Sequence, residues 1–412
     1  MQLKANPWLL WLLGALLFFS EYFVRTSSSV MVGDLMHEFA VDAIGIGTLS
    51  AFFYYPYTLM QIPVGLIVDR FPTGKILTFM ALMFAVGCLL FANTNQLMYA
   101  EAARAIMGCS AAFAFVGTLK LVTESFDAKV LGFLAGSTQA IGMLGAATGE
   151  GPVAVFVQSV GWRIAMRYMA AFISCIAILL LVFAWNSGAC SKIKHQVVKG
   201  IKQAVFDNKQ ALLNALFAGL IYAPTLAFGE LWGVKYLETV HKLSYSNAAA
   251  ALSWIFIGWG FGGPLQGLIS DKIGRRKPLL CSSAISSLIL MLIILQVPMA
   301  YNTLIFSMFC YGIANSGLVV SYAISGEINP DKQTGTTIAF TNMASVLLGT
   351  CCQPLVGWAL VYYWSGLKDG AGSPIYDANA YQHAMLFLPM LLVLAVIVSF
   401  LIKETNCKKE AI

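Results

Sequence analysis

Apolar stretches of about twenty residues recur along almost the whole chain, from Pro7 to Leu401. A helix needs about 20 residues to cross the roughly 30 Å of hydrocarbon in a bilayer. The 412 residues are 59% hydrophobic and only 11% charged, against about 25% charged in an ordinary soluble domain. A backbone in lipid must satisfy its own hydrogen bonds, which favours helices for runs of this length. The sequence therefore predicts an all-α membrane protein that lies almost entirely in the bilayer.

The polar breaks between the runs predict about twelve transmembrane helices. The expected spans are 8–36, 45–69, 75–93, 97–123, 129–157, 160–185, 209–236, 247–269, 277–297, 303–326, 332–364 and 380–403. A Lys-rich stretch separates the first six from the last six. We therefore expect an N-terminal six-helix bundle at 1–185, a cytoplasmic linker loop at 186–208 and a C-terminal six-helix bundle at 209–412.

The basic residues are distributed unevenly between the two ends of the predicted spans. Of the 25 Lys and Arg, seventeen fall on the side of the N-terminus, five on the other side and three within spans. Cytoplasmic loops carry an excess of Lys and Arg, so both termini are expected in the cytoplasm, in a bacterial inner membrane. Because the bases lie in short separated loops, the expected partner is the lipid bilayer and not nucleic acid.

The two predicted halves repeat each other in sequence. The segment GLIVDRFPTGK at 65–75 is echoed by GLISDKIGRRK at 267–277, and their aspartates, Asp69 and Asp271, lie 202 residues apart. Three further pairs keep this register within one residue: Pro63 with Pro264, Glu124 with Glu327, and Pro152 with Pro354. Parallel repeats of this kind build transporters whose substrate site lies near the membrane midplane at the repeat interface. The repeat therefore favours two pseudo-symmetric bundles and a transport function.

The two echoed loops resemble the signature that joins helices 2 and 3, and helices 8 and 9, in the major facilitator superfamily. The first copy departs from the family pattern because Pro72 is inserted and Thr73 precedes Gly74. Arg104 with Gly108 is similar to the Arg-centred motif of the family's fourth helix. The resemblance covers essentially the whole chain. It implies secondary active transport by alternating access, in a monomer.

A narrower resemblance rests on the first two spans. Glu21-Tyr-Phe-Val-Arg25, followed by Phe53-Tyr54-Tyr55-Pro56-Tyr57 and Gln61-Ile-Pro63, is similar to proteobacterial members that include the intraphagosomal amino-acid and nucleoside importers. It implies import of an amino acid.

Charged residues within spans are the sharpest functional signal. Counting about 1.5 Å per residue from Pro7 places Glu21 well inside the hydrocarbon, where a charge costs at least about 2.5 kcal/mol. Arg25 lies four residues later, so both side chains share one helix face. We interpret Glu21 as a proton-coupling carboxylate and Arg25 as the ligand of a substrate carboxylate or phosphate. A static ion pair that fixes helix packing is the alternative. Glu230 in the seventh span is a second candidate for proton coupling or for a substrate amine, unless it reaches water at the outer end, and Glu150 in the fifth span is a weaker one.

The charged loops are predicted to form a gate. An acid at the cytoplasmic end of a helix can accept hydrogen bonds from loop amides or a basic neighbour, and these bonds can break when the gate opens. The family resemblance implies the same role. The alternative is that the bases only set the topology. The expected gating residues are Asp69, Arg70, Glu124, Asp271, Lys272, Arg275 and Glu327.

Aromatic and amide side chains within the spans complete the predicted substrate site. Beside Arg25, the expected substrate contacts are Tyr54, Tyr55, Gln139, Tyr222, Trp254, Asn315 and Asn342. Aromatic residues in spans can equally pack or anchor helices. Amides can equally tie helices together, at about 0.6 kcal/mol each.

Several classes of function are disfavoured by what the sequence lacks. It contains no G-x-x-x-x-G-K-[ST] loop for ATP and no Cys or His spacing typical of zinc. We see no nucleophile with a base in the spans, so neither an enzyme nor a cofactor is expected. The sequence thus predicts a proton-coupled importer of a small polar metabolite such as an amino acid. A transporter of a larger organic anion such as a siderophore, and a sensor that no longer transports, are the alternatives.

Overall fold

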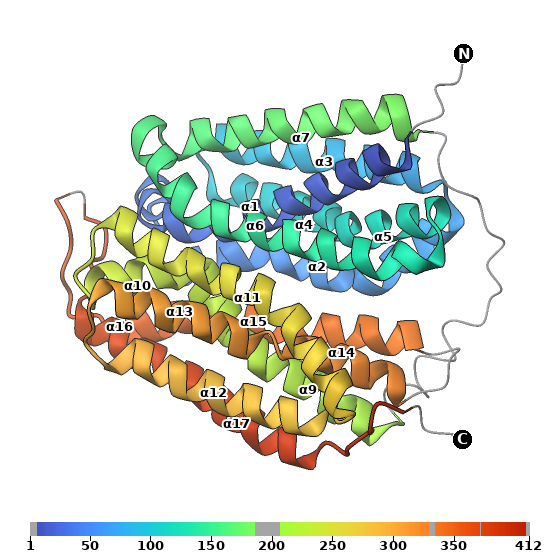
Figure 1. The fold of residues 1–412 in the computed structure, drawn as a ribbon. Helices are drawn as coiled ribbons and strands as arrows, with labels where there is room; N and C mark the ends of the chain where they lie inside the picture. The colour runs from blue at the N-terminus through green and yellow to red at the C-terminus, as the bar shows by residue number, and fades with distance from the viewer. Residues whose placement is uncertain (1–5, 186–206, 329–333, 371, 409–412) are drawn as a thin grey trace. The chain divides into compact units, whose positions relative to one another are not determined.

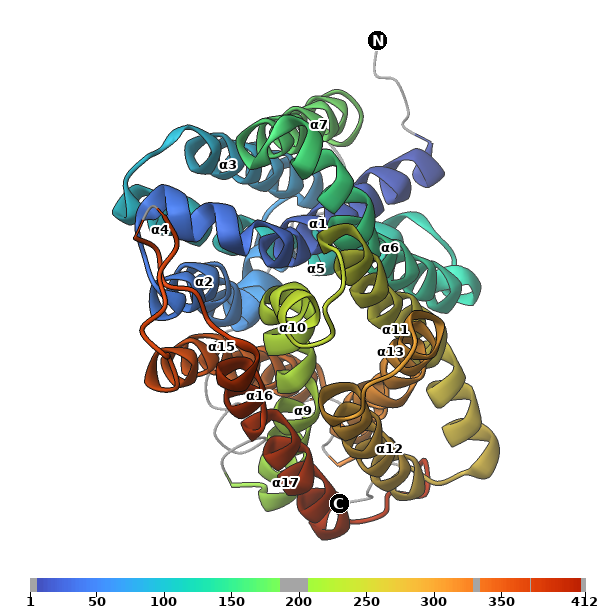
Figure 2. The same ribbon diagram turned by 90° about the vertical axis from the view of Figure 1, so that its left-hand side faces the viewer.

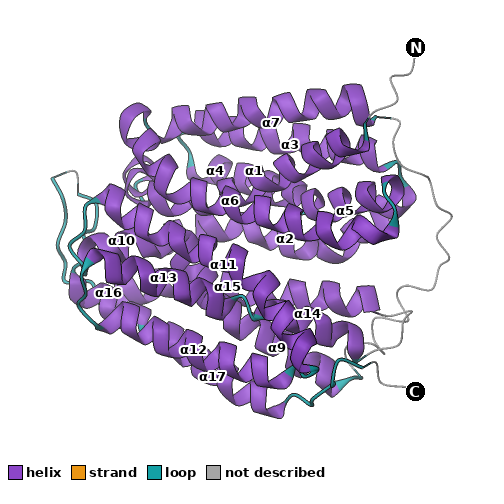
Figure 3. Ribbon diagram, in the orientation of Figure 1, coloured by secondary structure: helices purple, strands orange, loops and turns teal. Residues whose placement is uncertain are grey.

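The structure is a computed structural model that describes residues 6–185, 207–328, 334–370 and 372–408. Within these residues, twelve helical segments are long and apolar enough to cross a membrane. Figure 3 shows the helices joined by short loops. The predicted all-α membrane fold with about twelve spans is therefore confirmed. The predicted linker at 186–208 lies almost entirely outside the described residues, so the division of the chain at that point stays a prediction.

The chain forms two compact units. The first consists of Met1–Asp34 with Leu49–Ile193, and the second consists of Leu35–Thr48 with Lys194–Ile412. The turn between the first two helices thus belongs to the second unit, although most of both helices belongs to the first.

The described residues of the first unit form seven helical segments. They are α1 (Pro7–Phe39), α2 (Ala43–Arg70), α3 (Thr73–Asn93), α4 (Leu97–Ala111), α5 (Phe113–Ser125), α6 (Ala128–Val160) and α7 (Trp162–Ala184). Figures 1 and 2 both show α3 beside α7, and these two helices pack closely along their length.

The second unit contains the remaining described helices. They are α9 (Lys209–Pro224), η2 (Thr225–Trp232), α10 (Gly233–Thr239), α11 (Tyr245–Ile273), α12 (Lys277–Gln296), α13 (Tyr301–Asn315), α14 (Leu318–Glu327), α15 (Thr334–Tyr362), α16 (Ala378–Met385) and α17 (Phe387–Leu401). The closest helix pairs in this unit are α11 with α13 and α9 with α15.

The fourth and tenth spans are interrupted at equivalent places in the repeat. The first break falls at Ala112, between α4 and α5, and the second at Ser316 and Gly317, between α13 and α14. One turn before each break lies a glycine against which the backbone of another helix packs. A Cβ atom on Gly108 would overlap the carbonyl of Phe53, and one on Gly312 would overlap that of Ile255. Each unit therefore contains an equivalent crossing of two of its own helices, and only glycine leaves room for it.

The seventh span changes its helical pitch in the middle. It begins as α9, becomes the π-helical segment η2 directly after Pro224, and continues as α10. Proline lacks the N–H that an α-helix needs, and π-helical turns occur frequently at functional sites. This segment holds Glu230, so one of the predicted functional acids lies on an irregular stretch of backbone.

Candidate functional site

Arg25 lies in a cage of three tyrosine rings in the first unit. Its guanidinium carbon is 4.5 Å from the ring centre of Tyr22, 5.3 Å from that of Tyr54 and 5.5 Å from that of Tyr57. Its Nη1 lies 3.3 Å from Oε1 of Glu21, which is fully buried. Arg25 itself is 2% exposed. The ion pair that the spacing of four allows is therefore formed, and aromatic faces cover the rest of the cation.

Helical spacing explains which tyrosines reach the cation. Tyr54 and Tyr57 are three residues apart on α2, so they share one helix face. Tyr55 points elsewhere, is 38% exposed and contacts Phe52. Tyr55 was among the expected substrate contacts, whereas Tyr57 was named only within the aromatic run of the second span. The spacing of three between Tyr54 and Tyr57 was the signal that could have separated them.

Tyrosines from both α1 and α2 line the cage. Tyr22 follows Glu21 directly and lies three residues before Arg25, so α1 itself supplies one wall of the cage. Tyr57 from α2 lies close to Glu21 as well as to Arg25. Cation–π contacts contribute about 2 kcal/mol each when they are desolvated. The cage and the ion pair together offset the cost of burying the charges.

A second buried arginine, Arg104 on α4, ties together the first helices of this unit. Its guanidinium nitrogens donate to the carbonyls of Val24 and Ser50, each at 3.5 Å, and its carbon lies 5.0 Å from the ring centre of Phe53. These contacts join α4 to α1 and α2 beside the cage. Arg104 therefore supports the position of the helices that carry Glu21 and Arg25.

Glu150 lies next to α1, one turn beyond Arg25. The hydroxyl of Ser29 donates a hydrogen bond to its carboxylate, and Glu150 is fully buried on α6. The hydroxyl of Thr26 donates to the carbonyl of Ala146 at 3.0 Å, which fixes the crossing of α1 and α6. Buried acids thus lie on both sides of Arg25 along α1.

In the second unit, Glu230 and Tyr222 form a buried pair. The hydroxyl of Tyr222 donates to Oε1 of Glu230 at 3.0 Å, and the exposed fraction of Glu230 is zero. Tyr222 lies on α9 and also packs edge-on against Trp259, with ring centres 6.3 Å apart. Two residues predicted from sequence are therefore brought together where the π-helix interrupts the span.

Asn315 stabilises the same irregular backbone. Its Nδ2 donates to the carbonyl of Ile221 at 2.7 Å, and its Oδ1 accepts from the hydroxyl of Thr225 at 2.9 Å. The indole of Trp259 also donates to Oδ1, at 3.4 Å. Pro224 removes one backbone donor from the helix, and an amide from a neighbouring helix can satisfy freed carbonyls. These contacts support the interpretation that Asn315 holds neighbouring helices together.

The other predicted binding residues lie apart from these clusters. Oδ1 of Asn342 on α15 accepts from the hydroxyl of Tyr322 at 2.9 Å. Gln139 is half-buried on α6. Trp254 is 37% exposed and packs against Phe309, with ring centres 6.1 Å apart.

The predicted gating acids form a compact ionic cluster in each unit. In the first unit, Nζ of Lys120 lies 2.9 Å from Asp69 and 3.8 Å from Glu124. In the second, the guanidinium of Arg276 lies 2.6 Å from Asp271 and 2.7 Å from Glu327. In both units, one base bridges the two acids that the repeat places in register.

The bridging base enters from a different place in each unit. Arg276 lies five residues after Asp271, and the equivalent position in the first unit is Gly74. A Cβ atom at Gly74 would overlap the carbonyl of Ala184, so no longer side chain fits between α3 and α7 there. Lys120 on α5 supplies the missing charge instead.

The bases in the predicted gating set were therefore not the bridging ones. Lys272 and Arg275 are exposed, and neither forms an ion pair within the described parts of the chain. Arg70 lies over the ring of Phe71, at 5.7 Å. Which base of this loop is buried depends on how α11 and α12 pack against each other. The pattern of charges in the sequence alone does not reveal that packing.

Glu404 completes the cluster in the second unit. Its carboxylate accepts from the backbone N–H groups of Arg276 and Lys277 at 2.8 and 3.1 Å. Burial alone would raise the pKa of Glu404, but these and further backbone hydrogen bonds lower it. Burial alone would lower the pKa of Arg276, but its hydrogen bonds to Glu327 and Asp271 raise it. These hydrogen bonds thus favour the charged forms of Glu404 and Arg276.

One family model and several known transporters are similar to this chain. The family model described as Major Facilitator Superfamily matches residues 14–258 and 232–411. The chain is similar to the probable sulfoacetate transporter SauU of Cupriavidus necator, with 25% identity over 63% of this chain and 64% of that protein. It is also similar to the probable galactarate/D-glucarate transporter GudP of Bacillus subtilis, with 21% identity over 62% and 63%. The chain thus spans less than two thirds of the length of each of these two relatives.

Solved structures of similar fold cover nearly the whole chain. A bacterial homologue of the human lysosomal transporter Spinster superposes with a TM-score of 0.78 at 16% identity, over 96% of both chains. A D-xylose–proton symporter superposes with a TM-score of 0.73 at 16% identity, over 98% of this chain and 99% of that one.

Proposed function

The chain belongs to the Major Facilitator Superfamily, and from this premise we propose that it is a proton-coupled importer of a small polar metabolite bearing a carboxylate. The observation that most supports this proposal is the buried Glu21–Arg25 ion pair within its tyrosine cage. An ionisable residue within a membrane span is by default a functional candidate, because its burial is costly. We propose a bacterial inner membrane as its location, and the distribution of its basic residues supports both termini in the cytoplasm.

The ion pair suggests how proton and substrate are coupled. While Glu21 is ionised, it neutralises Arg25. Protonation of Glu21 removes that charge and leaves a buried cation without compensation, which costs about 3–5 kcal/mol. A substrate carboxylate that binds Arg25 restores neutrality and can accept two parallel hydrogen bonds. Proton and anionic substrate are therefore expected to bind together and not singly, which is the requirement for symport.

We assign Glu150 a supporting role in proton movement. Its hydrogen bond with Ser29 places a second carboxyl group one helical turn from Arg25, about 6 Å along α1. Ser29, Arg25 and Glu21 follow one another at intervals of four along α1, so a proton on Glu150 lies beside the same helix face as Glu21. This assignment rests on the α1–α6 contacts described above.

The second unit supplies the remaining proposed contacts. Glu230, held by Tyr222, is proposed as a second proton site or as the acceptor for a substrate amine. Beside Tyr54 and Tyr222, the more weakly supported substrate contacts are Tyr55, Gln139, Trp254, Asn315 and Asn342. The ionic clusters around Asp69 and Asp271 are proposed to hold one end of each unit closed and to break as the transporter changes state.

Two substrate classes fit this arrangement. An amino acid would place its carboxylate on Arg25 and its amine on an acid such as Glu230. A small organic acid without an amine is the second candidate, because two relatives are described as transporters of sulfoacetate and of galactarate or D-glucarate. The two classes differ in their need for Glu230, since only the first carries a cation.

Uptake into proteoliposomes tests the proposal. Amino acids and small organic acids would be supplied individually in labelled form, under an imposed inward proton gradient. Wild-type protein is expected to accumulate one class, whereas Glu21→Gln should lose accumulation and keep exchange of internal for external solute. Glu101→Gln, which removes an acid of α4 outside the cage, serves as the control and should accumulate normally.

Two results would contradict the proposal. Accumulation by Glu21→Gln at the wild-type level would show that this acid does not couple protons. No accumulation of either class by correctly inserted wild-type protein would contradict the importer and favour a transporter of a larger organic anion or a sensor.

A further inference from the structure

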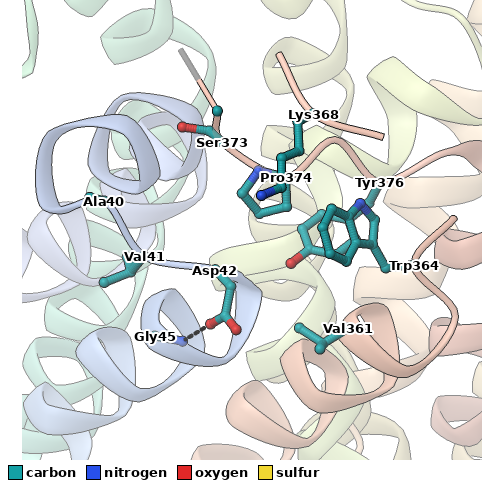
Figure 4. Close-up of a pocket in the computed structure, with 11 residues that line it drawn as sticks. Ala40, Val41, Asp42, Gly45, Val361, Trp364, Lys368, Ser373, Pro374 and Tyr376 are labelled. Atoms are coloured by element: carbon teal, nitrogen blue, oxygen red, sulfur yellow. Dashed lines mark hydrogen bonds between the residues drawn. The ribbon is translucent and has the colours of Figure 1, made fainter. Parts of the chain in front are cut away.

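A pocket of about 520 Å³ lies in the second unit, away from every residue assigned above. One wall is the turn between α1 and α2, with residues 40–45, and the other is the connection between α15 and α16. Figure 4 shows Asp42 on the first wall, and Lys368, Trp364 and Tyr376 on the second. Pockets for small ligands range from about 300 to 1,000 Å³. This one is large enough for a metabolite of amino-acid size.

The second wall is braced by hydrogen bonds among its described residues. Residues Lys368 and Pro374 form an antiparallel bridge, and the N–H of Ile375 donates to the carbonyl of Leu367 at 2.9 Å. The indole N–H of Trp364 donates to the same carbonyl, also at 2.9 Å. These bonds hold the side chains of the connection in place around the pocket.

One hydrogen bond joins the two walls. The backbone N–H of Ala43 donates to the hydroxyl of Tyr376 at 3.1 Å, and the phenol is buried. Burial raises the pKa of Tyr376, and the charge of Asp42 raises it further, against the effect of the Ala43 bond. The phenol is therefore neutral at physiological pH and keeps a proton that it can donate to a ligand.

The pocket carries one charge of each sign. Among its lining residues, Asp42 and Lys368 are the charged ones. Asp42 uses Oδ1 to accept from the N–H of Gly45 at 2.9 Å, and Nζ of Lys368 lies 5.9 Å from the ring centre of Trp364. Within the described chain, no ion pair joins Asp42 to Lys368. Two opposite charges thus face one cavity without neutralising each other.

We propose that this pocket binds a small zwitterion of the α-amino-acid class. The ammonium group is held by Asp42, the carboxylate by Lys368, and the side chain lies against Trp364 and Pro374. A ligand with both charges satisfies both walls, whereas a ligand with one charge leaves the opposite residue without a partner. In the proposed orientation the pocket opens on the outer face, where it concentrates solute beside the transporter.

The proposal rests on the proposed function only in the choice of amino acids as probes. Binding of labelled amino acids, supplied one at a time, would be measured on the full-length protein in lipid nanodiscs. The Arg25→Gln background disables the proposed transport site, so that saturable binding reports the pocket. The matching N-acetyl amino acid and amino-acid amide each lack one charge. Both are expected to bind at least about tenfold more weakly, a loss of about 1.4 kcal/mol.

Charge-removing variants test the two walls separately. Asp42→Asn keeps the oxygen that caps α2, and Lys368→Gln keeps most of the side-chain length, so both should fold. Each is expected to weaken binding about tenfold, or about 1.4 kcal/mol. The control is Asp369→Asn, which removes a neighbouring charge outside the pocket and preserves the acceptor of the Ser373 N–H bond. It should change affinity less than twofold.

The outcomes separate this proposal from the transport function. No saturable binding in the Arg25→Gln protein, or binding that Asp42→Asn and Lys368→Gln leave unchanged, overturns the pocket. Uptake by wild-type liposomes would then still support the transporter. Binding that depends on both charges, with no uptake, would support the pocket and refute the importer.

Discussion

Arg276→Gln is expected to destabilise the second unit more than the loss of any neighbouring base. Arg276 is 10% exposed at its side chain and bridges Glu327, which is 11% exposed, to Asp271, which is 67% exposed. An exposed ion pair contributes about 0–1 kcal/mol, so most of the effect comes from Glu327. Leaving one partner of a buried pair uncompensated costs about 3–5 kcal/mol. Because the site is partly exposed, we take the lower end, about 3 kcal/mol.

The assay is thermal unfolding of the purified protein, followed by intrinsic fluorescence. For a unit the size of the second one, a loss of 1 kcal/mol in the free energy of unfolding lowers the melting temperature by about 2–4 °C. The loss of about 3 kcal/mol should therefore lower the melting temperature by about 6–12 °C. The controls are Lys272→Gln and Arg275→Gln, which remove exposed bases of the same loop. Each should change the free energy of unfolding by less than about 0.5 kcal/mol.

A double variant isolates the physical cause. In Arg276→Gln/Glu327→Gln the buried carboxylate no longer carries a charge, so the protein should be more stable than Arg276→Gln alone. The reasoning is refuted if the double variant is less stable than the single one. It is also refuted if Lys272→Gln lowers the melting temperature as much as Arg276→Gln does.

Three further predictions follow from particular contacts. Gly312→Ala should cost about 2 kcal/mol, because its Cβ would overlap the carbonyl of Ile255, whereas Gly263→Ala, with 3.6 Å to its nearest neighbour, should leave the melting temperature unchanged. The lowered pKa of Glu404 stabilises the folded state above the carboxyl's ordinary pKa of 4.5, and this contribution should be lost as the pH falls through the folded-state pKa. A pH series of melting temperatures on wild type and Glu404→Gln checks this, and parallel curves would contradict it. Glu150→Gln should slow proton-driven uptake and leave solute exchange intact, and an unchanged rate of uptake would remove Glu150 from the proposed proton route.

How far the candidate site could be predicted depends on where its partners lie in the chain. Glu21 and Arg25 were identifiable because both lie on one helix, where a spacing of four brings side chains together. Tyr54 was also predicted as a substrate contact, but Tyr57 was named only within the aromatic run, although its spacing of three from Tyr54 indicated a shared helix face. The role of Arg276 was missed because three consecutive bases of the loop look alike in sequence.

The sequence by itself determined the membrane fold, the count of spans and the twofold repeat, since these follow from hydrophobic length and from residues in register. It also indicated that Glu21 is buried within a span, because about 1.5 Å per residue sets its depth. Only the tertiary structure decided that Lys120 bridges the acids of one unit and Arg276 those of the other. The same holds for Asp42 and Lys368, which face one pocket from opposite ends of the chain. Apart from the Lys120–Glu124 pair, which a spacing of four brings together, these placements depend on how separate helices and loops pack.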